Sequence, residues 1–283
     1  MARLRELENK SIFIIREALK KFKNPAILWS IGKDSTTLLW LCRKALPMGA
    51  KLNVIHVDTG CKFREIYEFR SRYTKEWNLN LTVAKNEEGI KNFSPEKSHF
   101  ECCNARKTEA LKQFVKKNNI DALLLGIRRD EHGLRNKERI MSPRDKDFRW
   151  RFAREKTATE EGDSPFESMQ DIELDGWNIF ATDFGAEADH VRVHPIINWT
   201  EQDIWDYIQK EGIPVVDLYF AKNGKRYRSI GCECCCSPVD SDANTVNKIV
   251  EELRTTNIKE RSGRAQDKEE TYIMQKLRSL GYM

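Results

Sequence analysis

The alternation of apolar and polar positions along this chain predicts helices interleaved with short buried strands. From Leu4 to Phe22 apolar residues recur at helical spacing, and Lys23-Asn24-Pro25 ends that helix. Short apolar runs predict strands at 26–29, 52–57, 79–83, 122–126 and 190–195. Among the first four of these, helical spacing predicts helices at 34–45, 64–77 and 104–118. We therefore expect an α/β fold, a parallel sheet with helices on both faces.

This regular alternation stops after Arg144, where the sequence becomes strongly acidic. Positions 155–189 hold eleven Asp and Glu residues and one lysine, which indicates an insertion that serves as a lid, a docking surface or a solvated charge run. The sheet pattern returns at His190, and Thr200 with Asp203 predicts a helix start. A cysteine-rich turn and helices at 244–255 and 268–280 follow. We expect an ATP-binding α/β domain over 1–221 and a segment over 222–283 that closes over its site.

Length and composition narrow the class of protein. The chain has 283 residues, and its 40% hydrophobic content is enough for a proper core. It contains no apolar stretch of the ~20 residues that a membrane span requires, and no signal-peptide core at its start, so we expect a cytoplasmic protein without membrane contact. The net charge of +5 is weak support for a nucleic-acid partner but compatible with polyanionic substrates.

The strongest chemical signal is Ser30-Ile31-Gly32-Lys33-Asp34-Ser35, between the first buried strand and a helix. A strand that turns on a glycine into a helix directs backbone N–H groups, two hydroxyls and a lysine at one spot, which describes a phosphate cradle. The competing interpretation is a plain turn with Asp34 or Ser35 as the helix N-cap. The spacing lacks the second glycine of the P-loop. It resembles the SxGxDS loop of the PP-loop pyrophosphatases, which cut ATP between its α and β phosphates.

Charged side chains follow two other predicted strands. Asp58 ends the second strand, where its carboxylate could hold Mg²⁺ on the phosphates or orient the ribose, or simply cap the helix near Arg64. Arg128 and Arg129 follow the fourth strand, and two adjacent guanidinium groups are suited to bidentate contacts with oxyanions. Solvated ion pairs are the alternative for these arginines. Because ligands of parallel sheets bind beyond the carboxyl ends of the strands, we expect these motifs to meet at one edge.

Several longer motifs carry a resemblance that runs nearly from end to end. The chain is similar to the small, catalytic subunit of bacterial sulfate adenylyltransferase, a PP-loop family related to the phosphoadenosine phosphosulfate reductases. The residues that carry the resemblance are SIGKDS at 30–35, HVDTGCKFRE at 56–65, NWTEQDIW at 198–205 and ERSGR at 260–264, with 9–12, 67–70, 128–131, 137–140, 213–214 and 218–221. The resemblance implies that ATP and sulfate react at the sheet edge to adenylylsulfate and pyrophosphate, with a larger GTPase subunit as partner.

The same resemblance implies roles for the site residues. Ser30, Lys33 and Ser35, in the loop that also contains Gly32 and Asp34, would hold the leaving pyrophosphate of Mg-ATP. Arg128 and Arg129 would bind the sulfate or the α-phosphate, and Lys33 with these two arginines forms the expected catalytic set. Arg261 and Arg264 would close over the site. No acid or base is required, which suits a chain whose five histidines form no evident pair. Whether the protein forms a homo-oligomer stays open.

The cysteines depart from this family and point to a second one. Cys102-Cys103 and the later Ser-Ile-Gly-Cys-x-x-Cys resemble the iron-sulfur signature of assimilatory adenylylsulfate reductases, with Cys102, Cys103, Cys232 and Cys235 at the matching positions. The resemblance implies a 4Fe-4S cluster, and a tetrahedral zinc site is the competing use of four thiolates. Neighbouring Cys234 and Cys236 are further candidate ligands. We expect thiols or metal ligands rather than disulfides, because the chain shows no export signal.

A cluster keeps rival functions open. The reductases form a thiosulfonate on a cysteine near the carboxyl terminus, and this chain has no thiol after Cys236, so reduction lacks its nucleophile. A second rival is an iron-sulfur PP-loop enzyme that activates DNA or a tRNA base for sulfur insertion, for which +5 is weak support. A regulatory subunit that merely binds adenylates is the third. Adenylyl transfer to sulfate is the interpretation that these motifs favour.

Overall fold

The protein is described here by a computed structural model, which covers residues 2–47, 50–135, 138–149, 188–265, 277, 280 and 281. The predicted acidic insertion, apart from its last two residues, lies outside these described residues. Most of the predicted helix at 268–280 lies outside them as well. Within the described part of the chain, no helix is long and apolar enough to cross a membrane.

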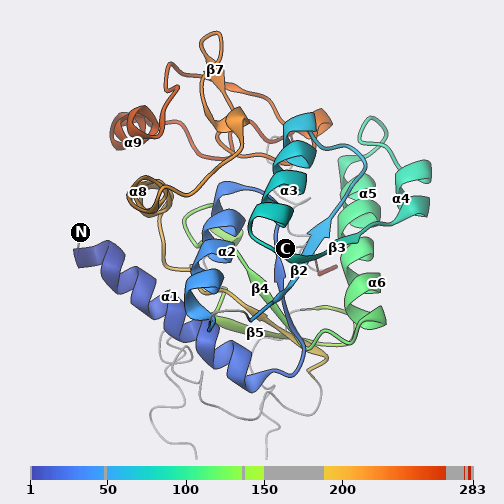
Figure 1. Cartoon of the computed structure of the whole chain (residues 1–283). Coiled ribbons are helices and arrows are strands. Elements are labelled where there is room, and N and C mark those ends of the chain that lie inside the picture. The colour runs from blue at the N-terminus through green and yellow to red at the C-terminus, as the bar shows by residue number, and fades with distance from the viewer. Residues whose placement is uncertain are drawn as a thin grey trace, which may run out of the picture.

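A six-stranded sheet forms the centre of the molecule, and its strands run in the order β3-β2-β1-β4-β6-β5 (Figure 1). These strands are β1 (Pro25–Leu28), β2 (Asn53–Val57), β3 (Asn80–Ala84), β4 (Ala122–Leu125), β5 (Met141–Arg144) and β6 (His190–Val193). All neighbouring pairs are parallel except β5 and β6, where Met141 lies opposite Val193 in an antiparallel register. The prediction of a parallel sheet is therefore confirmed except at this edge. Strand β5 went unpredicted because it contains Pro143, and proline is tolerated in a strand at a sheet edge.

Helices cover both faces of the sheet, as predicted. One core cluster takes residues from α1 (Ala2–Lys21), α2 (Lys33–Ala45), α3 (Arg64–Glu76), α8 (Glu201–Glu211) and α9 (Val246–Thr255). A second cluster, on the opposite face, takes residues from α6 (Ala110–Lys117). Strand β1 shows why two clusters arise, because Ile27 belongs to the first while Ala26 and Leu28 belong to the second. Successive side chains of a strand point to opposite faces, so a strand covered on both sides is apolar throughout.

The predicted helix at 104–118 is part of a longer helical stretch. It starts with α5 (His99–Cys103), continues through a π-helical turn (Asn104–Glu109) and ends with α6. A short helix that the sequence reading missed, α4 (Glu87–Asn92), comes before it and is capped by the Asn86 side chain. The predicted cap of α8 is confirmed, since the Thr200 hydroxyl accepts from the Asp203 N–H and the Asp203 carboxylate accepts from the Thr200 N–H.

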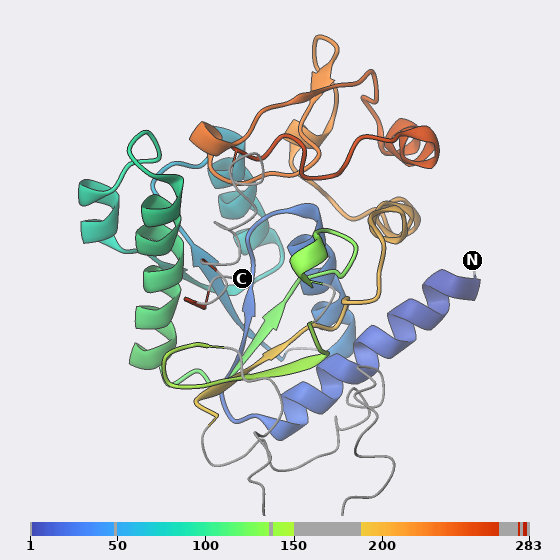
Figure 2. The same cartoon turned by 180° about the vertical axis from the view of Figure 1, so that it is seen from behind.

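The chain after α8 crosses the edge of the sheet where the parallel strands end (Figure 2). This part contains the 3₁₀ turns Asp217–Tyr219 and Glu233–Cys235 and a small two-stranded sheet of β7 (Lys225–Arg226) and β8 (Val239–Asp240). A further 3₁₀ turn, Gly133–Arg135, follows β4. The strand ends and this later segment together form the walls of a pocket.

Candidate nucleotide site

A pocket lies at the carboxyl ends of β1, β2 and β4, where the sequence predicts the ligand to bind. The strand ends and the start of α2 form its floor, and Ser229–Gly231, Arg261 and Arg264 form the opposite wall. Among the described residues its lining includes six basic side chains, Lys33, Lys62, Lys107, Arg135, Arg261 and Arg264, and two acidic ones, Asp34 and Glu131. The lining therefore carries an excess of positive charge, which favours a polyanionic ligand.

The predicted phosphate loop connects β1 to α2 on the pocket floor. The Ser30 and Ser35 hydroxyl oxygens lie 3.0 Å apart, and the Ser35 hydroxyl also donates to the Gly32 carbonyl at 3.1 Å. The chain turns at Ile31, whose φ is 69°, whereas Gly32 has an ordinary φ of −72°. The expectation that the turn depends on the glycine is therefore wrong in its detail. A β-branched residue with positive φ is strained, and burial of the Ile31 side chain in the core holds it there.

Gly126, at the end of β4, permits the close approach of this strand to the start of α2. A Cβ atom at Gly126 would lie 2.8 Å from the Ser35 nitrogen and 2.9 Å from the Asp34 carbonyl carbon. Sequence reading placed this glycine only as the last residue of a strand. The signal that was available is its position two residues before Arg128, at the end of the strand next to the phosphate loop.

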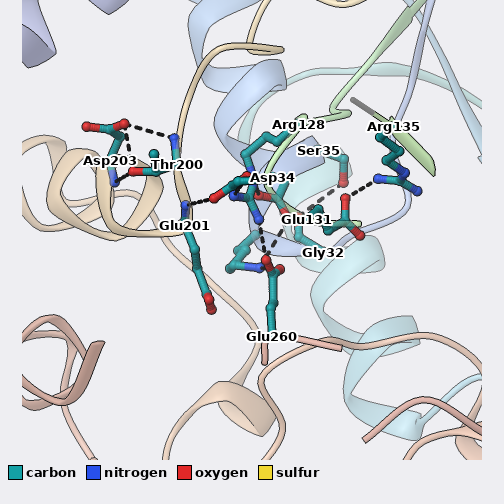
Figure 3. Close-up of polar contacts among 12 residues, drawn as sticks. Gly32, Asp34, Ser35, Arg128, Glu131, Arg135, Thr200, Glu201, Asp203 and Glu260 are labelled. Carbon is teal, nitrogen blue, oxygen red and sulfur yellow. Dashed lines mark hydrogen bonds and ion pairs between the residues drawn. The ribbon is translucent and has the colours of Figure 1, made fainter. Parts of the chain in front are cut away.

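The two predicted cations Lys33 and Arg128 are fully buried, and both contact Glu260. Figure 3 shows Arg128 beside Glu260. The Lys33 ammonium also lies 3.2 Å from the Asp34 carboxylate. Arg128 bonds Asp34 through Nε at 2.6 Å and Asp130 through Nη1 at 2.5 Å. We call Lys33, Asp34, Arg128, Asp130 and Glu260 the carboxylate side of the pocket.

Charge on the carboxylate side is fixed by these contacts. Burial alone would lower the pKa of Lys33, but the carboxylates of Asp34 and Glu260 outweigh burial and raise it. Arg128 behaves in the same way, with its pKa raised by Asp34 and Glu260 against the effect of burial. Both side chains therefore stay charged, and carboxylates of the chain itself already balance them. Glu260 was seen in the sequence only as part of a family motif, and its role as a shared counter-ion was missed.

A second ion-pair group lies beside the first. Glu131 contacts both Arg135 and Arg261, the latter at 2.9 Å. Burial alone would raise the pKa of Glu131, but these two guanidinium groups hold it below its ordinary value. Arg261 is therefore placed at the pocket, as predicted, through a carboxylate that the sequence reading treated only as an ion-pair alternative.

Three of the predicted nucleotide-site residues are not part of the pocket lining: Arg128, described above, Arg129 and Asp58. The Arg129 guanidinium donates to the Asn198 side chain at 2.6 Å and to the Glu138 carbonyl at 3.1 Å, so it ties β4 to the segment before α8. The Asp58 carboxylate accepts from the Gly60 N–H at 2.9 Å and the Tyr67 hydroxyl at 3.0 Å, with Arg70 at 3.5 Å. Both side chains hold neighbouring loops in place, and neither is brought together with Lys33 and Arg128.

The two acidic residues of the pocket lining, Asp34 and Glu131, decide whether the pocket itself offers ligands for Mg²⁺. Asp34 offers one oxygen to Arg128 and the other to Lys33, and the two oxygens of Glu131 contact Arg135 and Arg261. Mg²⁺ needs an oxygen ligand whose lone pairs are available. Cations of the chain already balance the charges of these two acidic residues, so we do not expect them to attract Mg²⁺, and the ion would depend on the phosphates and water.

Another part of the pocket lining is formed by lysines that lie close to buried thiols. Lys62 and Lys107 line the pocket, and the Lys107 ammonium lies 3.9 Å from the Cys103 sulfur. The four predicted ligands Cys102, Cys103, Cys232 and Cys235 are all buried, and Cys232 accepts a hydrogen bond from Cys235. We call Lys62, Lys107 and these four cysteines the thiol side of the pocket.

The thiol side has its own electrostatic pattern. A hydrogen bond from Cys235, with Lys107 and Lys62 nearby, places the pKa of Cys232 below its ordinary value, although burial opposes this. Burial raises the pKa of Cys102 to about 11. Burial and the charges of Lys107 and Arg264 lower the pKa of Lys62. Among the described residues, no three His, Cys, Asp or Glu side chains converge as ligands of one metal ion.

Arg264 and the remaining cysteines complete the description of the predicted residues. Arg264 lines the pocket, as predicted, and its Nη1 lies 2.9 Å from the Cys236 sulfur, which also accepts from the Gly231 N–H at 3.1 Å. Cys234 is exposed, and its sulfur lies 2.9 Å from that of Cys61. Cys42 is buried in the core, which fits simple packing.

Solved structures with this fold include two enzymes of adenine nucleotides. A Candida glabrata FMN adenylyltransferase, solved with FAD and pyrophosphate, superposes with a TM-score of 0.57 at 15% identity, over 96% of this chain and 81% of that one. A Candida auris phosphoadenylyl-sulfate reductase, solved with phosphate, gives a TM-score of 0.52 at 15% identity, over 84% of this chain and 97% of that one. At these identities the likeness concerns the fold.

Comparison of sequences gives the family. Residues 24–238 match the phosphoadenosine phosphosulfate reductase domain. A protein of Geotalea daltonii named sulfate adenylyltransferase subunit 2 is 36% identical over 314 aligned positions, which cover 100% of this chain and 98% of that protein. The chain therefore belongs to the sulfate adenylyltransferase subunit 2 family, within the larger group that shares the phosphoadenosine phosphosulfate reductase domain.

Proposed function

We propose that this protein transfers the adenylyl group of ATP to sulfate, giving adenylylsulfate and pyrophosphate. The observation that carries the proposal is the pocket at the start of α2, where the two loop serines and six basic side chains surround one space. A helix N-terminus with such cations binds phosphate groups. The full-length similarity to proteins named sulfate adenylyltransferase subunit 2 supports sulfate as the acceptor.

The reaction needs positioning and charge rather than proton transfer. A sulfate oxygen forms a bond to the α-phosphorus while the bond from that phosphorus to the bridging oxygen breaks, and the electron pair leaves with pyrophosphate. Sulfate carries no proton near neutral pH, so no general base is required. Fixed donors stabilise the crowded, negatively charged transition state of such a transfer.

We assign the contacts to ATP and sulfate by their place in the pocket. Ser30, Ser35 and the backbone N–H groups at the start of α2 hold the leaving pyrophosphate, with Arg261 and Arg264 opposite them. Lys33 and Arg128 are tied to Glu260, so they hold the loop and the later segment together. Arg129 and Asp58 position the adjoining loops. ATP binds as its magnesium complex, with the ion carried by the phosphates.

We further propose that the thiol side holds a 4Fe-4S cluster. Support comes from four buried cysteines of two distant segments, of which Cys102 and Cys232 are close enough to influence each other's charge. Lys62 and Lys107 beside them offset the negative charge that four thiolates bring to a cluster. A bound cluster supplies a fixed charge next to the nucleotide. The partner we propose is a larger GTPase subunit, in keeping with relatives named subunit 2.

Pyrophosphate release by anaerobically purified protein tests the reaction. ATP is supplied with sulfate, adenylylsulfate, DNA or tRNA in turn, with and without the large subunit of a related sulfate adenylyltransferase. We expect release that depends on sulfate and falls at least about tenfold in Ser35→Ala, because one hydrogen bond to a charged group is lost. Ser71→Ala, on the exposed face of α3, is the matched control. Pyrophosphate release that depends on DNA or tRNA would instead favour sulfur insertion into nucleic acid. Formation of sulfite from adenylylsulfate would favour the reductase.

Metal analysis tests the cluster separately. We expect iron and acid-labile sulfide, a broad absorbance band near roughly 400 nm, and loss of both in Cys232→Ser but not in Cys42→Ser. Cys42 is equally buried but belongs to the apolar core. Stoichiometric zinc without colour would reject the cluster and leave the adenylyl transfer proposal intact.

A further inference from the structure

Two cysteines outside the proposed cluster ligands meet at the surface of the molecule. The Cys61 sulfur, in the loop after β2, lies 2.9 Å from the Cys234 sulfur in the cysteine-rich turn, 173 positions later in the chain. Both are free thiols, with Cys234 exposed and Cys61 half-buried. A disulfide bond is about 2.05 Å long, so the two sulfurs lie within about 1 Å of bonding distance.

The segments that carry the two thiols are held together by other contacts. The Glu233 N–H donates to the Cys61 carbonyl at 2.9 Å, and the Thr59 hydroxyl lies 3.2 Å from the Cys232 sulfur. The rings of Phe63 and Tyr227 pack with their centroids 5.0 Å apart. These contacts fix the approach of the two backbones, so the thiols are positioned for each other in the reduced protein.

We propose that Cys61 and Cys234 form a reversible disulfide and constitute a thiol–disulfide exchange site for small disulfides such as oxidised glutathione. One protein thiolate attacks the small disulfide, forms a mixed disulfide and releases one small thiol. The second protein thiolate then displaces the other small thiol and closes the Cys61–Cys234 bond. Two protein thiols are oxidised and one disulfide is reduced to two thiols, so atoms and electrons balance.

The bond would link two walls of the nucleotide pocket. Val57 and Lys62, on either side of the Cys61 loop, and Ser229–Gly231, just before the cysteine-rich turn, all line that pocket. Oxidation therefore removes the freedom of these walls to separate and slows exchange of whatever ligand the pocket holds. The disulfide itself requires no nucleotide chemistry and can be mapped whether or not the protein transfers adenylyl groups.

Disulfide mapping of the full-length protein tests the site. The anaerobically purified protein is incubated with oxidised glutathione, alkylated and digested with trypsin. We expect two fewer alkylated cysteines than in the untreated protein alkylated after denaturation, and the peptide 52–62 to be linked to the peptide 229–248. Dithiothreitol restores both thiols. The link is expected to persist in Cys42→Ser, the matched control, and to vanish in Cys61→Ser and Cys234→Ser, with unchanged circular dichroism as the check on folding.

Four outcomes would overturn the proposal. One is a protein that keeps all its thiols under these conditions. Another is glutathione attached to Cys61 or Cys234 without a link between the two peptides. The third is a link that survives in Cys234→Ser, which would assign the bond to Cys232, Cys235 or Cys236 instead. Iron content is measured in parallel, and a link formed only when iron is lost counts against the site as well.

Discussion

The two sides of the pocket use cations in opposite ways. On the carboxylate side, Lys33 and Arg128 are buried, and carboxylates of Asp34, Asp130 and Glu260 meet their charges at ion-pair distance. On the thiol side, Lys62 has no described carboxylate as a partner, and burial together with Lys107 and Arg264 lowers its pKa. On the carboxylate side the cations are therefore neutralised by the chain itself. On the thiol side the pocket lining keeps an excess of positive charge.

This difference separates structural cations from ligand-binding cations. Removing one partner of a buried ion pair leaves an uncompensated charge in the interior, which costs stability. Removing a cation that repels its neighbours relieves the folded protein and instead costs the affinity for an anionic ligand. Arginine or lysine at a strand end therefore does not by itself identify a phosphate contact, and its counter-ions decide the role.

Arg128→Met should break the carboxylate side and give the largest effect. The substitution leaves Asp34, Asp130 and Glu260 without this partner, so we expect a loss of about 3–5 kcal/mol in the free energy of unfolding. Urea denaturation followed by circular dichroism measures it. The neighbouring Arg129→Met is the matched control and should cost about 1 kcal/mol, because that side chain bonds to neutral oxygens. Equal costs would remove the distinction between the two arginines.

Glu260→Gln tests whether this carboxylate competes with the ligand. We expect a loss of roughly 1.5–3 kcal/mol in the free energy of unfolding, because the amide is uncharged and offers one acceptor oxygen where Lys33 and Arg128 each use a carboxylate oxygen of Glu260. ATP should bind more tightly, because Lys33 and Arg128 lose a negative charge that balances them. Calorimetric titration measures the affinity, and Glu251→Gln on the exposed face of α9 is the control. Weaker ATP binding at unchanged fold would show that Glu260 organises the site rather than competing for its cations.

Lys62→Ala, on the thiol side, should weaken ligand binding without lowering the stability of the fold. We expect the KM for ATP or sulfate to rise about tenfold, equivalent to about 1.4 kcal/mol, with the stability unchanged or slightly increased. Steady-state pyrophosphate release and urea denaturation give the two readouts, and Lys75→Ala on the exposed face of α3 serves as the control. A destabilised protein with a normal KM would place Lys62 among the structural cations.

A mildly acidic pH should produce the smallest effect, through His56 on β2. This side chain is buried, its Nδ1 lies 2.9 Å from the Trp29 carbonyl, and burial lowers its pKa to about 3. Between pH 6.5, the ordinary pKa of histidine, and about pH 3, His56 binds a proton in the unfolded chain but not in the folded protein. The free energy of unfolding therefore falls as the pH falls through this range. From pH 7 to pH 6 we expect His56 to account for a loss of about 0.7 kcal/mol.

The matched variant for this pH effect is His56→Asn, which keeps a donor for the Trp29 carbonyl but does not titrate. Urea denaturation at both pH values should show a pH-dependent loss that is smaller in the variant by that amount. An identical pH dependence in both proteins would mean that His56 is not held neutral.

Much of the fold followed from local patterns. Five predicted strands, the helix from Leu4 to Phe22 and the cap of α8 are confirmed, because apolar spacing and capping residues act over a few positions. Strand β5 and helix α4 were missed, since Met141–Arg144 contains a proline and Glu87–Asn92 spans fewer than two turns. The turn at Ile31 was missed because only burial in the core holds that residue at positive φ.

The site residues likewise fall into those that a local pattern predicts and those that only the folded chain brings together. Ser30, Gly32, Asp34 and Ser35 form one continuous loop, and the sequence placed them at a strand end beside the pocket. By contrast, Glu260 lies 227 positions from Lys33 and 132 from Arg128, and no pattern within a segment can pair residues so far apart. The sequence by itself determined five of the six strands of the sheet, the loop and the family, because neighbouring residues encode them. Only the tertiary structure decided which cations are already neutralised, because counter-ions are chosen by proximity in space.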